Sequence, residues 1–516
     1  MPAWQTDALI VDAVRSPIGK RHGTLSHIRG DDLSAQVVNG LLARHDLDPG
    51  EVEDLQWGCV TQIDEQAWNV GRNVALAAGW PVSVCGTTVD RQCGSSMQTN
   101  FNAAAAVWSG QLEVVVSGGV EMMSRVPMGS NNGSMSDAVT DRFDIVPQGI
   151  SAEEIADKWN LSREELDRYS YESHMRAARA IDEGRFEKEI VPVDIDVPED
   201  PVAGSGNPAT LVRTRFAVDE AVRRETTLER MAALQPAFVP DGKVTAGNSS
   251  QIVDGSAAVL LASERKASEL GLTPRARFLG FGLAGLDPHL MLHGNPQACE
   301  RALAKAGLTW DDIEVIEVNE AFASVVLQFL ADTGLHERWE AGDVNPNGGG
   351  ISLGHPLGAT GARITATLIS ELERRDARYG IACMCIGFGQ AIAGVVERLG
   401  PTGCSFAVAV TRRCRHAASR SSATRRRGGR RFSRASSRSP TRRSGNACSP
   451  SWRSCRAPST TRSERAGHGA SPSGRWPSST TSSARRRWKR RASCRSRCGG
   501  TRTSASPRSS SRPRGR

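Results

Sequence analysis

The sequence lacks a long hydrophobic run, a leader-like pattern in its first residues and cysteines at disulfide-like spacing. No stretch of about 18 consecutive apolar residues occurs, which excludes a membrane-spanning helix. The N-terminus has no charged segment followed by an apolar one, so we expect that the protein is not secreted. The first 400 residues contain no C-x-x-C pair and no disulfide-like spacing, which favours a cytoplasmic location. The cysteines of this region are Cys59, Cys85, Cys93, Cys299, Cys383 and Cys385.

The region after residue 400 lacks Leu, Ile, Met, Tyr, Asp and Gln altogether. It holds 31 of the 65 Lys and Arg residues of the chain but only one of the 56 acidic residues, Glu464. Residues 1–400 keep 34 basic and 55 acidic residues, so they carry a net charge of −21, whereas the whole chain carries +9. A segment so poor in apolar side chains cannot offset the entropy of its own ordering, and we predict that 400–516 is disordered.

Two interpretations of this basic tail differ in function. One is an arginine-rich arm that binds nucleic acid through its phosphates. Its tryptophans (Trp452, Trp476 and Trp488) are isolated, however, and no RNA-binding signature accompanies them. The other is a GC-rich gene read in a shifted frame, or read through past a natural end near Gly400, which gives the same enrichment in Arg, Ser, Pro and Ala. We favour the second interpretation and expect no nucleic-acid partner; the tail cysteines have no metal-binding spacing.

Strand-like and helix-like segments alternate in a similar order in two parts of residues 1–400. Residues 93–110 predict a helix of small residues and 111–124 a buried strand. Residues 354–373 predict a second helix, and 380–398 predict a strand, a glycine turn and another strand. This alternation indicates an α/β fold with largely parallel pairing and two similar halves. We place the halves at 1–120, completed by about 246–270, and at 271–399.

The region between the halves, 121–245, has a different character. It contains Met, Gly and Pro together with two amphipathic helical patterns. The longer pattern opens with Ser162 and has Glu165 three residues later, which is a capping box. We interpret this region as an inserted, mostly helical lid over the substrate.

Three short strings pair a reactive side chain with glycines or other small residues. They are DRQCGSSMQ around Cys93, GGGISLGHPLGATG around His355, and CIGFG from Cys385. Glycine lets a backbone approach a ligand closely. A thiol, an imidazole and a second thiol suit chemistry in which one cysteine accepts an acyl group and another residue moves a proton. Together the strings predict one active site, in which we interpret Cys383 as a packing residue on the same strand face as Cys385.

These strings lie among SGGVEMMSRVPMG, TAGNSSQIVDGSAAVLL and VNEAFA, in the order of a known family over residues 5–399. The chain resembles a thiolase. The resemblance implies two βαβαβαββ halves in a five-layered αβαβα arrangement, with a loop domain that covers coenzyme A. It also implies reversible, CoA-dependent cleavage or formation of a 3-ketoacyl thioester. We therefore expect acyl-CoA substrates, coenzyme A as a substrate, no permanently bound cofactor or metal, and a homodimer or homotetramer.

The resemblance also implies roles for individual residues. Cys93 resembles the nucleophile that holds the acyl group, and His355 the residue that accepts its proton and donates toward the thioester oxygen. Cys385 resembles the thiol that protonates the departing acetyl-CoA carbanion and later deprotonates incoming CoA. Asn319 would hold a water that forms one oxyanion hole with His355, and the backbone amides of Cys93 and Gly387 would form the second. Because Cys93 opens a predicted helix, we expect the helix dipole and the imidazole to favour its thiolate.

Two further residues resemble contacts of coenzyme A. Ser250, in TAGNSS, corresponds to a contact of the pantetheine arm, and Arg224, in RRETT, to a residue near the adenine. A serine in a turn or a solvated arginine is the alternative interpretation of each.

Departures from the family pattern concern the substrate. Short-chain acetoacetyl-CoA members carry His-Met-Gly where this chain has Pro147, Gln148 and Gly149. Ser96 stands where many members have Gly, and Phe388 lies within the terminal string. The pattern is closest to degradative thiolases of fatty-acid or sterol side-chain β-oxidation, with the biosynthetic acetoacetyl-CoA enzyme as the alternative. A ketoacyl synthase, which shares the ancestral fold, would use two histidines, or His and Asn, instead of a second thiol.

Overall fold

The computed structural model describes residues 6–198 and 211–400 of the chain. The predicted disordered tail, with both interpretations of its function, lies outside the described residues. No helix within the described ranges is long and apolar enough to cross a bilayer.

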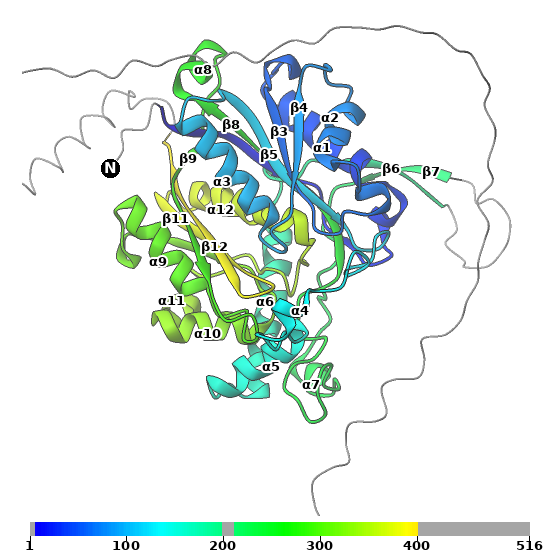
Figure 1. The fold of residues 1–516 in the computed structure, drawn as a ribbon, viewed down its shortest axis with the longest axis vertical. Coiled ribbons are helices and arrows are strands. Elements are labelled where there is room, and N and C mark those ends of the chain that lie inside the picture. The colour runs from blue at the N-terminus through cyan, green and yellow to red at the C-terminus, as the bar shows by residue number, and fades with distance from the viewer. Residues whose placement is uncertain (1–5, 199–210, 401–516) are drawn as a thin grey trace, which may run out of the picture. The chain divides into compact units, whose positions relative to one another are not determined.

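The N-terminal half alternates strands with helices (Figure 1). Its predicted helix after Cys93 begins at Ser95, and the buried strand that follows spans Val114–Met122. The elements are β1 (Ala8–Arg15), β2 (Gly19–Lys20), α1 (Gly30–Ala43), β3 (Asp54–Gly58), α2 (Val70–Ala77), β4 (Cys85–Val89), α3 (Ser95–Trp108), β5 (Val114–Met122), β8 (Val253–Ser263) and α8 (Glu264–Glu269).

The C-terminal half repeats most of this order, but an isolated bridge between Ile316 and Val344 stands where the N-terminal half has β4. The predicted second helix begins at Thr360, five residues after His355, and a strand, a glycine turn and a strand follow it as expected. The elements are β9 (Ala276–Gly285), α9 (Asn295–Ala306), β10 (Val315–Val318), α10 (Ala323–Thr333), α11 (His336–Glu340), α12 (Thr360–Arg374), β11 (Tyr379–Ile386) and β12 (Gln390–Arg398).

Strand pairing shows that the two halves share a topology. β3 pairs in parallel with β5, and β10 pairs in parallel with β11. β5 then pairs antiparallel with β8, and β11 antiparallel with β12. β8 and β12 are in turn antiparallel to β1 and β9. The weak sequence repeat therefore corresponds to a repeat of strand order.

The prediction of largely parallel pairing is wrong. Among the described strands only β3–β4, β3–β5 and β10–β11 are parallel. β11 and β12 are joined by the short turn of Gly387, Phe388 and Gly389, which leaves no room for the crossover that parallel strands need. β8 follows the inserted segment 121–245 and pairs antiparallel with β5.

The helices and strands form five layers, as the resemblance implied. α1 and α2 cover one face of the N-terminal strands, and α9 and α10 cover one face of the C-terminal strands. α3 and α12 lie between the two halves (Figure 1). Along β11 the alternation is direct: Cys383 and Cys385 face the outer helices, whereas Met384 and Ile386 face the central ones. The two sets of strands meet where β1 pairs with β9, so the strand order is continuous from β10 to β4.

The two central helices pack with little space between them. A Cβ atom added to Gly361 of α12 would collide with the backbone nitrogen of Met97 on α3. Nearby, the hydroxyl of Ser96 accepts a hydrogen bond from the backbone N–H of Ala362 at 3.0 Å. Ser96, one of the departures from the family pattern, thus links α3 to α12.

The segment predicted as a lid contains helices and one hairpin. Its elements are α4 (Asp137–Thr140), α5 (Gln148–Lys158), α6 (Arg163–Asp182), β6 (Val193–Pro198), β7 (Leu211–Phe216) and α7 (Leu228–Ala232). The predicted capping box is confirmed, because the Ser162 hydroxyl accepts from the N–H of Glu165 and the Glu165 carboxylate accepts from the N–H of Ser162. Tyr169 and Ser173 of α6 donate to the buried carboxylate of Glu320 at 2.8 and 2.7 Å, which ties this segment to the VNEAF loop.

Candidate active site

A strained turn presents Cys93. Gln92 has a left-handed backbone conformation, with φ of 47°, which few residues other than glycine adopt. The Ser95 hydroxyl holds this turn, because it accepts from the N–H of Arg91 at 3.0 Å and donates to the carbonyl of Gln92 at 2.6 Å. α3 begins at Ser95, with Gly94 as its N-cap, so Cys93 lies just before the helix.

The Cys93 thiol is buried and surrounded by hydrogen-bond donors. Burial raises its pKa to about 11, although the backbone N–H groups of Gly387 and Cys93 and the side chain of Gln148 act in the opposite direction. Desolvation of the charged sulfur outweighs these donors. The influence of the helix dipole and the imidazole on this thiol stays a prediction.

Cys385 lies next to Cys93. It is fully buried near the end of β11, and burial, followed by the charges of Cys93 and Cys383, raises its pKa well above the ordinary value. Cys383 is also fully buried, and Cys299 of α9 is its hydrogen-bonding neighbour. Cys383 thus packs in the core, in agreement with its interpretation as a packing residue, while Cys385 has the sulfur of Cys93 as a neighbour.

His355 is held as a neutral base. Its Nδ1 lies 2.6 Å from the hydroxyl of Thr360, and that hydroxyl donates its own proton to the carbonyl of Pro356 at 2.8 Å. Nδ1 must therefore carry the hydrogen, which leaves the lone pair on Nε2. Burial and then the positive charge of Arg363 lower the pKa of His355 to about 3.

Asn319 approaches His355 from the loop after β10. Its side-chain nitrogen lies 3.3 Å from Nε2 of His355, and its backbone N–H donates to the carbonyl of Cys383 at 2.9 Å. The amide oxygen of Asn319 is buried and has no hydrogen-bond partner among the described residues. A buried acceptor of this kind fits a bound water.

The turn between β11 and β12 closes the site from another side. Phe388 and Gly389 have φ of 63° and 76°, so the chain reverses tightly there. A Cβ atom added to Gly387 would lie 2.8 Å from Nε2 of Gln148. Glycine at this position therefore leaves room for the Gln148 side chain beside the backbone. The side chain of the next residue, Phe388, is exposed.

A buried carboxylate joins the halves beneath the site. Glu121 of β5 accepts from the backbone N–H groups of Val60, Thr61 and Gly358 at 3.0, 3.0 and 2.9 Å. Gly358 belongs to the GHPLGATG string, so Glu121 fixes the loop that carries His355 against the N-terminal strands.

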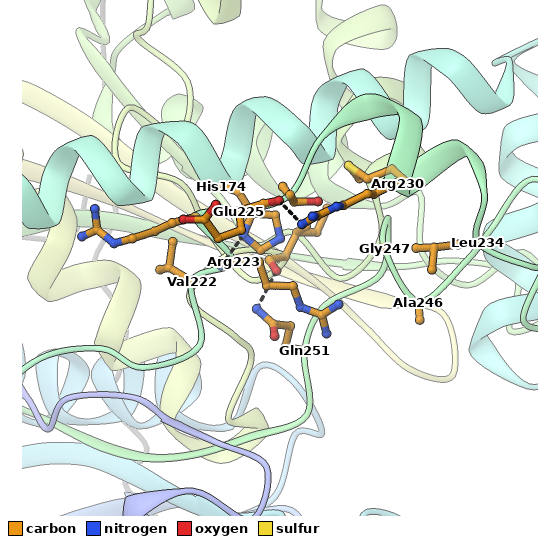
Figure 2. Close-up of a pocket in the computed structure, with 13 residues that line it drawn as sticks. His174, Val222, Arg223, Glu225, Arg230, Leu234, Ala246, Gly247 and Gln251 are labelled. Atoms are coloured by element: carbon orange, nitrogen blue, oxygen red, sulfur yellow. Dashed lines mark hydrogen bonds between the residues drawn. The ribbon is translucent and has the colours of Figure 1, made fainter.

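A cavity of about 510 Å³ adjoins the His355 loop (Figure 2). Gln251 connects the two, because its carbonyl accepts from the N–H of His355 and its side chain donates to the carbonyls of Ile351 and Ser352. Figure 2 shows His174 of α6 at the cavity, where its Nδ1 accepts from the N–H of Arg223 at 3.2 Å. The other residues that line the cavity come from 222–234 and 246–247.

The two predicted coenzyme A contacts lie differently with respect to this cavity. Arg224 lines it, but its guanidinium forms an ion pair with Asp182 at 2.8 Å. Ser250 is half-buried and is followed by Gln251, which lines the cavity, but Ser250 does not itself line it. Arg223 also lines it, and its side chain has no ion-pair partner among the described residues.

Three residues of the site were missed by sequence reasoning about roles. The sequence pattern indicates Gln148 only as part of a substrate loop, and it indicates no role for Thr360 or Glu121. Thr360 lies within the quoted GHPLGATG string, at the i+5 position from His355, so a search for a hydroxyl near the imidazole could have found it. Glu121 lies within SGGVEMMSRVPMG, but no local pattern shows that its carboxylate reaches the His355 loop, or that Gln148 reaches Cys93.

The sequence matches the family model described as the thiolase N-terminal domain over residues 8–265, and that of the thiolase C-terminal domain over residues 272–398. The chain belongs to the thiolase family. Among curated relatives, it is 45% identical over 400 residues to the 3-ketoacyl-CoA thiolase of Vibrio vulnificus (strain CMCP6), with 76% of this chain and 99% of the relative covered. It is also 45% identical over 399 residues to the 3-ketoacyl-CoA thiolase of Idiomarina loihiensis, with 76% and 100% covered.

Solved structures agree with this membership. The thiolase fold of the chain matches the Bacillus anthracis acetyl-CoA acetyltransferase with a TM-score of 0.69 and 38% identity, covering 77% of this chain and all of that one. It matches human mitochondrial 3-ketoacyl-CoA thiolase with a TM-score of 0.67 and 35% identity, covering 76% and 99%. This thiolase therefore spans the full length of its relatives within its first 400 residues.

Proposed function

We propose that this thiolase cleaves 3-ketoacyl-CoA with coenzyme A to give acetyl-CoA and a shortened acyl-CoA, through an acyl group on Cys93. The observations that carry the proposal are that the buried thiols of Cys93 and Cys385 are neighbours, and that the string of His355 packs through Gly361 against Met97 on the helix after Cys93. Two thiols beside a neutral imidazole provide a nucleophile, a base and a second proton carrier.

In the first half-reaction, Nε2 of His355 takes the proton of the Cys93 thiol. The thiolate attacks the 3-keto carbon, and the bond between C2 and C3 breaks. The carbanion of acetyl-CoA takes the proton of the Cys385 thiol and leaves. The neutral state of His355 supports this assignment, because only an imidazole with a free lone pair accepts a proton.

In the second half-reaction, coenzyme A gives its thiol proton to the Cys385 thiolate. The CoA thiolate attacks the acyl carbonyl, and Cys93 leaves as a thiolate that regains its proton from His355. The N–H groups of Cys93 and Gly387 stabilise the oxyanion on one carbonyl, and His355 with a water on Asn319 stabilises the other. Each such donor is worth about 2.7–4 kcal/mol in the transition state.

Coenzyme A would occupy the cavity beside the His355 loop, as a substrate and not as a resident cofactor. Arg223, Arg224 and Arg230 give this cavity positive charge for the CoA phosphates. We assign the main phosphate contact to Arg223, because Arg224 is already paired with Asp182. Ser250 would contact the pantetheine arm, and the segment 121–245 would cover the substrate as a lid domain.

The substrate would be a medium, long or sterol-derived 3-ketoacyl-CoA, and the setting β-oxidation in the cytoplasm. The curated relatives named above support degradation. The similarity to an acetyl-CoA acetyltransferase keeps acetoacetyl-CoA chemistry as the second candidate.

We propose a homodimer or homotetramer that associates through β4. This strand ends the strand order, so its outer edge has no strand partner in the described part of the chain. Beside it Trp68 and Val82 are 89% and 82% exposed, which is unusual for such large apolar side chains. Sedimentation of the purified protein tests this part of the proposal.

The deciding experiment incubates the protein with 3-ketohexadecanoyl-CoA and coenzyme A and separates the CoA esters by liquid chromatography. Equal amounts of acetyl-CoA and tetradecanoyl-CoA are expected. Cys93→Ser should abolish both products, and Cys299→Ser, which changes a buried cysteine on α9 outside the catalytic strings, should not. Equal activity of Cys93→Ser and the parent protein would refute the proposed function.

A further inference from the structure

Gln148 connects the lid segment to the nucleophile. It is the first residue of α5, after the N-cap Pro147, and its side chain is half-buried. Its amide reaches two members of the site: it hydrogen-bonds the Cys93 sulfur, and its Nε2 lies against the backbone of Gly387. The other two donors to the sulfur are the backbone N–H groups of Gly387 and of Cys93 itself, so Gln148 supplies the side-chain donor among the described residues.

In the contact between Gln148 and the Cys93 thiolate, only the glutamine can donate the hydrogen bond. A thiolate accepts hydrogen bonds and donates none, whereas the Nε2 atom of glutamine donates two. The Cys93 sulfur must become a thiolate twice in the proposed cycle, once before it attacks and once when it leaves the acyl group. A donor at the sulfur therefore acts in both half-reactions.

We propose that Gln148 is a catalytic residue whose side-chain amide donates a hydrogen bond to the Cys93 thiolate. The proposal rests on the proposed function for its place in the cycle. It also assigns a chemical role to one departure from the short-chain pattern, in which an apolar Met stands at this position and offers no donor.

The test uses the alkylation of Cys93 by iodoacetamide, which needs no substrate and reports the thiolate directly. Gln148→Met keeps the length of the side chain and removes the donor. Gln148→Glu keeps its shape and replaces the donor with a carboxylate. Gln111→Met, which changes an exposed glutamine after α3, is the matched control. Alkylation is followed across pH by mass spectrometry of the Cys93 peptide.

We expect Cys93 in Gln148→Met to react about tenfold more slowly than in the parent protein at every pH below the thiol pKa, since a hydrogen bond to an ionised group is lost. Gln148→Glu should react more slowly still, because it adds a negative charge beside the sulfur. Gln111→Met should match the parent protein.

An unchanged alkylation profile in both Gln148 variants would overturn the proposal. A changed preference for acyl length with unchanged alkylation would do so as well, because Gln148 would then only shape the acyl pocket. Gln148→Glu is nearly isosteric, so it provides the answer if Gln148→Met does not fold. Failure of the protein to cleave 3-ketoacyl-CoA would refute the proposed function. The alkylation results would still test the hydrogen bond from Gln148 to Cys93, because they need no substrate.

Discussion

Thr360 fixes the tautomer of His355: the Thr360 hydroxyl lies 2.6 Å from Nδ1 of the imidazole and gives its own proton to the carbonyl of Pro356. Nδ1 therefore keeps a hydrogen, and Nε2 faces Asn319 with its lone pair. The α12 helix begins at Thr360, so the first residue of a core helix determines which nitrogen of the base is available.

Replacement of this hydroxyl should slow catalysis without unfolding the protein. We expect Thr360→Val to lower the rate of Cys93 acylation by roughly tenfold or more, because general-base catalysis depends on the orientation of the base. Thr365→Val is the control, since Thr365 is a buried threonine on the same helix. Stopped-flow acylation of both variants measures the effect; equal losses would mean that the hydroxyl acts only through packing.

The reactivity of Cys93 should increase with pH far above neutrality. Burial raises the pKa of this thiol to about 11, so the neutral thiol dominates at lower pH and the thiolate fraction grows about tenfold per pH unit. We expect the alkylation rate of Cys93 in the free protein to keep increasing through pH 9 and beyond. A plateau below pH 8 would instead indicate a preformed thiolate and imidazolium pair.

The sequence predicted much of this site because the reactive residues stand in strings with fixed glycine spacing. At three glycines of these strings a side chain would collide or a positive φ is needed: Gly361, Gly387 and Gly389. The strings therefore specify the backbone conformation of the site as well as its reactive residues. The order of strands and helices followed from apolar periodicity in the same way.

Other features depend on three-dimensional neighbours that no local pattern records. The burial that raises the pKa of Cys93 could not be predicted, because the sequence shows the start of the helix but not the extent of burial. Gln148 reaches Cys93 from the lid segment, and Glu121 reaches Gly358 from the other half. The antiparallel return of β8 depends on the route of the chain through 121–245.

The first 400 residues should form the complete enzyme. Both family matches end by residue 398, and β12 ends at Arg398. We expect truncation after Gly400 to leave thiolysis of 3-ketoacyl-CoA unchanged. Loss of folded, active protein would show that the tail contributes to the fold. A gel-shift assay across salt concentrations compares the two forms, and salt-sensitive retention of the full chain alone would support the nucleic-acid arm.

Acyl length should distinguish the two candidate substrates. Each additional buried CH₂ contributes about 0.8 kcal/mol, so a long acyl pocket should increase kcat/KM with chain length. We expect kcat/KM for a medium or long 3-ketoacyl-CoA to exceed that for acetoacetyl-CoA by roughly tenfold or more. Thiolysis kinetics over a series of acyl lengths measure this. A maximum at acetoacetyl-CoA would return the chain to the short-chain group.

The pairing of two thiols is the central claim, and Cys385→Ala tests it most directly. Cys383→Ala is the matched control, because Cys383 is equally buried two residues earlier on the same face of β11. Each variant is mixed with 3-ketohexadecanoyl-CoA for cleavage and, separately, with tetradecanoyl-CoA for acyl transfer to Cys93, followed by mass spectrometry of the protein. Cys385→Ala should lose carbon–carbon cleavage but still form the Cys93 adduct, while Cys383→Ala retains both. Cleavage of 3-ketohexadecanoyl-CoA by Cys385→Ala at the rate of the parent protein would contradict the assignment. It would instead favour a mechanism that needs a single thiol.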